Sequence, residues 1–198
     1  MNRDKLLDII ENHSRWIIHG GKIGQQAILH KVDLRDADLG GSELSEIDLS
    51  ESDLSCALIS WSSFQNAILK KVNFEQTNLE GSNLQNTILI GANFRNANLW
   101  YANLKEAELR NANFENASLQ FADFEGAIMI GSNLTKSNLM NANLAGANLE
   151  GANLSGALLE DTKLSGANLR GITIGSKNLS LIPSALLERY RTTFWVIN

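Results

Sequence analysis

The sequence predicts an all-β solenoid, a parallel β-helix with four-sided coils of twenty residues and short α-helical caps at both ends. Three observations predict this fold class. Every fifth residue from Leu29 to Leu179 is Leu, Ile, Phe or Met. The residue two positions earlier is Ala, Ser, Thr, Val or Ile throughout the range from Ala27 to Ile172. Large apolar residues at each of two outward positions of the repeat are separated from one another by multiples of ten residues.

The five-residue period excludes a single α-helix and a flat strand. A step of five residues rotates by about 140° around an α-helix, so the large residues would spiral instead of forming a stripe. On a flat strand, an odd step alternates between the two faces. Both apolar positions stay inside only if the chain turns a corner in every repeat. One outward residue then separates them, and two bend residues follow. Successive corners close a coil, and stacked coils form a solenoid.

The outward apolar residues predict how many repeats form one coil. Those between the two inward positions are Ile28, Leu58, Ile68, Ile88, Ile128 and Leu158. The large ones just after the central residue are Ile90, Trp100, Ile130 and Met140. This rhythm places them on two opposite sides of a four-sided coil, whereas a three-sided coil would distribute them over all sides. Phe74, Phe94 and Phe114, twenty residues apart, should therefore stack inside the solenoid.

The residues before the repeats predict an N-terminal helical cap over residues 1–26. A β-helix leaves unpaired backbone groups at its ends, so solenoids need caps. Within residues 4–18, one face follows helical spacing. Its members are Leu6, Ile10, His13 and Ile17. Gly20 and Gly21 suit the end of this helix.

The repeats are expected to form the β-helix over residues 27–181, followed by a C-terminal segment over residues 182–198. Pro183 can open a short helix in this segment. The residues from Phe194 to Ile197 then form an apolar tail. Two roles stay open for the segment: it completes a C-terminal cap, or it joins a second subunit in a homodimer.

The repeat resembles the signature of the pentapeptide-repeat family, Ala-(Asp/Asn)-Leu-x-x. It occurs as ADLGG at 37–41, ANFRN at 92–96, ANLAG at 142–146 and ANLEG at 147–151. The resemblance covers residues 27–181, and the segment before them looks like the cap of stand-alone bacterial members. It implies a right-handed quadrilateral β-helix. It also implies one alternative function, because some members imitate B-DNA, inhibit DNA gyrase and confer quinolone resistance.

The chain carries no arrangement of residues typical of catalysis, and we expect neither an enzyme nor a cofactor or metal. Cys56 is the single cysteine and has no candidate partner base, so it forms no internal disulfide and is not an activated nucleophile. The histidines lack cysteine or carboxylate neighbours at metal-ligand spacing. They are His13, His19 and His30. Outward Asn residues should instead form a hydrogen-bonded ladder from coil to coil. Its members are Asn73, Asn93, Asn113, Asn133 and Asn153.

Outward apolar residues on two opposite sides are the candidate partner-binding residues. One side carries Trp61, Trp100, Tyr101, Phe121 and Met140, and the opposite side carries Ile88, Ile90, Ile128 and Ile130. Exposed apolar patches mark interaction sites, and Trp and Tyr anchor interfaces. Gly81 occupies the bend between the coils of Trp61 and Tyr101. We therefore expect a notch at Gly81 that accepts an apolar side chain of a partner.

The net charge of −5 is concentrated near the N-terminus. Residues 31–53 contain eight acidic and two basic residues, whereas residues 162–198 contain five basic and one acidic residue. A DNA mimic needs acidic groups along its whole length to imitate phosphates. The sequence therefore favours a non-enzymatic protein–protein interaction module or scaffold with an unidentified protein partner. The alternative is a DNA-mimicking inhibitor of a DNA-binding enzyme such as gyrase.

The expected location is the cytoplasm. No run of about 18 apolar residues is present that could span a membrane. The first residues are charged throughout, unlike a signal peptide. We expect a protein that binds neither nucleic acid directly nor a membrane.

Overall fold

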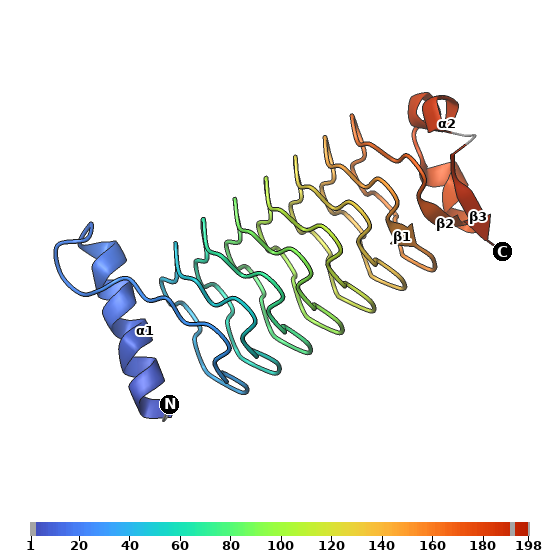
Figure 1. Cartoon of the computed structure of the whole chain (residues 1–198). Coiled ribbons are helices and arrows are strands. Elements are labelled where there is room, and N and C mark those ends of the chain that lie inside the picture. The colour runs from blue at the N-terminus through green and yellow to red at the C-terminus, as the bar shows by residue number, and fades with distance from the viewer. Residues whose placement is uncertain (1–2, 191–192, 198) are drawn as a thin grey trace.

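The chain forms one stack of coils that lies between two terminal segments (Figure 1). The structure is a computed structural model that describes residues 3–190 and 193–197. Helix α1 (Arg3–Ile18) precedes the coils. Helix α2 (Ser184–Tyr190) and strand β3 (Trp195–Ile197) follow them.

Each coil contains twenty residues, as predicted. Parallel β-bridges join outward residues that are twenty positions apart, for example Asp53 to Asn73 and Asn73 to Asn93. The large central residue of every repeat from Leu29 to Ile174 is buried. The solenoid is therefore a four-sided parallel β-helix with a continuous apolar core.

Where the outward residue of a repeat is Asn or Asp, its side chain stabilises the bend that follows. The Oδ1 atom of Asn93 accepts a hydrogen bond from the backbone N–H of Arg95 at 3.2 Å. The following residue, Asn96, has a left-handed backbone with φ 58°. The backbone N–H of Ala97 then donates to the carbonyl of Phe94 at 3.1 Å. Asn and Asp suit this task because their short side chains bond to the backbone two residues further on.

The core holds the predicted stack of phenylalanines. The ring centroids of Phe74 and Phe94 are 5.0 Å apart, and those of Phe94 and Phe114 are 4.8 Å apart with an interplanar angle of 1°. Ser132 Oγ has no hydrogen-bond partner among the described residues, but most hydroxyls at the small inward position donate to a backbone carbonyl of their own coil or of the preceding one. Thr77 Oγ1, for example, donates to the carbonyl of Leu54 at 2.7 Å. Backbone carbonyls that face the bore thus allow Ser and Thr at positions otherwise filled by Ala.

The predicted asparagine ladder runs along one side of the solenoid. The Nδ2 atom of Asn93 donates to Oδ1 of Asn73 at 2.9 Å, and the same bond joins Asn113 to Asn93 at 3.2 Å and Asn133 to Asn113 at 2.9 Å. At the N-terminal end, Asn73 donates to Asp53 at 2.9 Å. The ladder is confirmed from Asn73 to Asn133.

Helix α1 covers the open N-terminal edge of the first coil. Leu6 and Ile10 are buried in the same apolar core as the coils. Gly24 has φ 88°, and a Cβ there would lie 2.3 Å from the backbone oxygen of Asn12 on α1. Only glycine allows the chain to pass this close to the helix. No helix in the described ranges is long and apolar enough to cross a membrane.

The coils end in a three-stranded parallel sheet. Strands β1 (Asn153–Leu154), β2 (Thr173–Gly175) and β3 pair in that order. Regular coils stop at β2, although the sequence register continues to Leu179, because Ser176–Leu181 forms the 3-10 helix η1. The last three residues of the predicted apolar tail, Trp195–Ile197, form β3, the last strand of the sheet.

The predicted limits of the two caps include residues outside the described ranges. The sequence predicts the N-terminal cap over 1–26 and the C-terminal segment over 182–198, around the repeats at 27–181. Division of the chain at these limits stays a proposal. In α2, Leu186 is buried against the core.

Candidate interaction surface

The coil period brings the predicted aromatic residues together along one edge of the solenoid. We call Trp61, Trp100, Tyr101 and Phe121 the aromatic edge. The rings of Tyr101 and Phe121 stack with centroids 4.9 Å apart, and Trp100 meets Tyr101 edge to face at 6.3 Å. Their side chains are exposed, with 66% for Trp61, 53% for Tyr101 and 44% for Phe121. Met140, predicted on the same side, is half-buried.

Three members of the aromatic edge occupy a backbone conformation that disfavours them. Trp61, Tyr101 and Phe121 have φ values of 59°, 55° and 59°. This left-handed region suits Gly and Asn and costs a bulky residue of the order of 1 kcal/mol. Every other described left-handed residue is glycine or polar, apart from Cys56. The three aromatic residues therefore occupy strained backbone positions and keep 44–66% of their surface exposed.

The expected notch at Gly81 is wrong. A Cβ on Gly81 would lie 2.5 Å from the Cε3 and Cζ3 atoms of Trp61, so the indole ring leans over the glycine. Spacing along the chain predicts an empty place at this bend, but the long indole side chain of the preceding coil covers it. The absence of a side chain at Gly81 thus makes room for the Trp61 ring, and the bend offers no cavity for a partner's side chain.

The opposite side is a weaker candidate surface. Parallel bridges place Ile68 beside Ile88, and Glu108 beside Ile128. The predicted binding residues on this side are all half-buried, namely Ile88, Ile90, Ile128 and Ile130. Glu108 also forms an ion pair with Arg110, which places charge in the middle of the isoleucine residues.

Lys105 pairs with two acidic residues beside the aromatic edge, whereas Glu80, next to Gly81 at the bend between Trp61 and Tyr101, is a further acidic residue there. Lys105 Nζ lies 3.3 Å from Asp123 and 2.9 Å from Glu125. Hydrogen bonds to Glu125 and Asp123 raise the pKa of Lys105. The lysine and Asp123 therefore form a structural ion pair.

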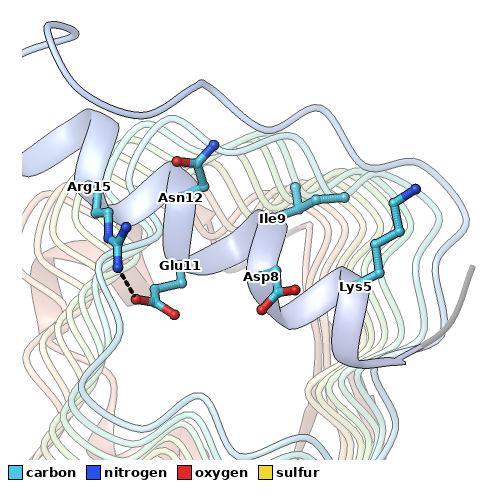
Figure 2. A pocket seen from close by; sticks show the side chains of 6 residues that line it. All are labelled: Lys5, Asp8, Ile9, Glu11, Asn12 and Arg15. Carbon is cyan, nitrogen blue, oxygen red and sulfur yellow. Dashed lines mark hydrogen bonds and ion pairs between the residues drawn. The ribbon is translucent and has the colours of Figure 1, made fainter.

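The described residues carry little that resembles a catalytic centre. No group of three or more His, Cys, Asp or Glu residues among them could hold a metal ion. A pocket along α1 is lined by that helix alone, and its Arg15 is paired with Glu11 at 2.6 Å (Figure 2). Its other members are Lys5, Asp8, Ile9 and Asn12. Cys56 is exposed at a bend, with Sγ 3.7 Å from Gln76 Oε1.

Sequence reasoning missed two features that the structure supplies. The left-handed backbone of the aromatic edge follows from the second bend position of the repeat, so the five-residue register could have indicated it. No pattern in the sequence indicated that β3 would be exposed, because an apolar tail can equally be buried in a cap. Trp195 on β3 is 71% exposed.

Comparison with known proteins agrees with the repeat pattern. A family model described as pentapeptide repeats matches the chain in eight copies, over residues 27–66, 57–96, 92–129 and 137–173. None of the curated proteins matches the chain.

Solved structures of related proteins are similar to this chain. QnrB1, a plasmid-mediated fluoroquinolone resistance protein, is 19% identical with a TM-score of 0.40, over 76% of this chain and 83% of that one. HetL from the cyanobacterium Nostoc, involved in heterocyst differentiation regulation, is 26% identical with a TM-score of 0.36, over 87% and 96%. A protein from the thylakoid lumen of Arabidopsis thaliana is 28% identical with a TM-score of 0.16, over 72% and 64%.

The repeat, the coils and the matched segments agree on one classification. The matched segments span most of the solenoid, and the bends and core of the structure repeat in the same five-residue register. The chain belongs to the pentapeptide-repeat family, and its fold is a right-handed, four-sided β-helix.

Proposed function

We propose that this protein is a non-enzymatic interaction module that binds a protein partner through the aromatic edge. One observation carries the proposal: three large aromatic residues share one edge, have left-handed backbones and remain exposed. Stability does not explain them, because Asn or Gly would relieve the backbone at the same positions. Backbone strain kept at an exposed site is typical of functional surfaces.

The surroundings of the aromatic edge favour a partner segment that is apolar and uncharged. The outward residues on the two flanking sides are mostly amides and hydroxyls, such as Asn98 before the bend and Asn103 after it. On the same side Lys105 is shared by Asp123 and Glu125, and Glu80 adds one more negative charge at the bend. Aromatic anchors with a polar, mostly uncharged rim resemble the centre of a protein interface. Binding should therefore depend weakly on ionic strength.

Photo-cross-linking in host cells tests this proposal even though the partner is unidentified. A photoreactive phenylalanine analogue replaces Phe121 on the aromatic edge, and the matched control places it at Asn116, which has the same left-handed backbone one bend earlier. We expect a protein that is cross-linked in host cells from position 121 and not from 116. Equal products from both positions, or none from 121, would contradict the proposal.

Self-association through the C-terminal sheet is a second candidate function, supported by the exposure of β3. This strand is the last in the order β1-β2-β3, and Trp195, Val196 and Ile197 are all exposed. An edge strand with apolar side chains can pair with a second copy. Light scattering should show that the wild-type chain is a homodimer. The variant Val196→Lys should be a monomer with the thermal stability of the wild type. A monomeric wild-type chain would exclude this candidate.

A further inference from the structure

Side chains of α1 take the place of a missing coil at the N-terminal edge. Inside the solenoid, the carbonyls of Ser63 and Gln65 accept backbone N–H groups from the preceding coil, at 2.7 and 2.9 Å. The equivalent carbonyls of the first coil, Glu43 and Ser45, have no preceding coil. Ser14 Oγ donates to the Glu43 carbonyl at 2.7 Å, and His13 Nε2 donates to the Ser45 carbonyl at 2.9 Å.

His13 uses both ring nitrogens in this closure. Its Nδ1 atom accepts a hydrogen bond from the backbone N–H of Ala27 at 3.1 Å, while Nε2 donates to Ser45. The residue is 0% exposed. These two bonds require the neutral ring with its proton on Nε2. A second proton on Nδ1 would point at the N–H of Ala27, so the protonated ring cannot keep both bonds.

The charged neighbours of His13 only partly offset its burial. The carboxylates of Glu43 and Glu46 in the first coil favour the protonated ring, as does the Ser45 carbonyl. On α1 itself, Glu11 and Arg15 are exposed and paired with each other. Burial is the largest effect and lowers the pKa of His13 below its ordinary value of 6.5.

We propose that His13 makes the N-terminal cap acid-sensitive: protonation of its ring releases α1 from the edge of the first coil. Release exposes Leu6 and Ile10 together with the carbonyls of Glu43 and Ser45. The two carbonyls are backbone groups that a covered β-edge protects from pairing with another chain.

The sign of the pH dependence follows from the closed and open states. The open cap leaves His13 in water with its ordinary pKa of 6.5, and the closed cap binds the proton less tightly. The closed state is fully stable above that pH and loses stability as the pH falls below it. The loss levels off once the pH is below the pKa of the closed state.

Amide hydrogen exchange of α1, corrected for intrinsic rates, tests the proposal on the full chain from about pH 8 to about pH 5. We expect the open population to rise below pH 6.5, by up to about tenfold per pH unit. His13→Gln removes the titrating group and should make α1 exchange independent of pH, whether its cap is closed or open. His19→Gln, at an exposed histidine, should behave like the wild type. An unchanged pH profile in His13→Gln would overturn the proposal.

A second readout needs no variant. Ring ¹⁵N and ¹³C resonances of His13 should report the Nε2–H form at neutral pH and a midpoint below 6.5. A titration midpoint at or above 6.5, or the Nδ1–H form at neutral pH, would refute the proposed acid sensitivity of the cap. This readout holds even if the His13 variant fails to fold.

Discussion

At the residue scale, Phe94 represents the central position of the repeat. Its ring is fully buried between Phe74 and Phe114. Phe94→Ala removes this burial and leaves a cavity that rigid neighbouring coils cannot fill, so we expect a loss of about 3–5 kcal/mol in the free energy of unfolding. Denaturant titration measures it. A loss below about 1 kcal/mol would mean that the ring is not part of the core.

Phe121 represents the opposite case, an aromatic residue that we expect to be dispensable for folding. Phe121→Asn gives up the stack on Tyr101, worth about 0.5–1.5 kcal/mol, and relieves a left-handed backbone at φ 59°, worth about the same. We expect a thermal midpoint close to that of the wild type. A destabilisation comparable to that of Phe94→Ala would contradict the account, because it would give Phe121 a structural role.

At the element scale, Gly24 controls how closely the chain approaches α1. Gly24→Ala should cost about 2–4 kcal/mol, because its Cβ would meet the Asn12 backbone oxygen at 2.3 Å and its φ is left-handed. Gly41→Ala is the matched control, since Gly41 has φ 66° and no heavy atom within 4 Å of the added Cβ. It should cost only about 1 kcal/mol. Hydrogen exchange of α1 separates the two: equal protection in both variants would disprove a tight contact.

The coils could be predicted from the sequence in detail, whereas the ends could not. In the solenoid, each side chain lies beside the residue twenty positions away, which is often of the same type. Spacing alone therefore predicted the stack at Phe94 and the hydrogen-bonded ladder at Asn93. The caps contain no repeat, so spacing does not show which of their residues lie side by side. Helix α1 was predicted from its apolar face, but the use of His13 as a hydrogen-bonding plug depends on contacts with Ser45 that no spacing reveals. The notch at Gly81 failed for a related reason, because Trp61 leans across coils.

At the scale of the whole molecule, we use the distribution of charge to rank the interaction module above a DNA mimic. Acidic residues gather at 31–53, and residues 162–198 are basic. Along the middle coils the outward column from Asn73 to Asn133 is uncharged. We expect no inhibition of gyrase supercoiling at micromolar protein. Strong inhibition would reverse this ranking of functions and direct attention to the acidic first coils.

The proposed function requires that the aromatic edge serves binding and not folding. The most direct measurement compares thermal unfolding and partner capture for the double variant Trp100→Ser/Tyr101→Ser with those of the wild type. Both side chains are exposed and lie outside the core, so we expect a thermal midpoint close to that of the wild type. We also expect loss of the partner that is cross-linked by the photoreactive analogue at position 121. A melt that collapses, or capture that persists unchanged, would contradict the claim.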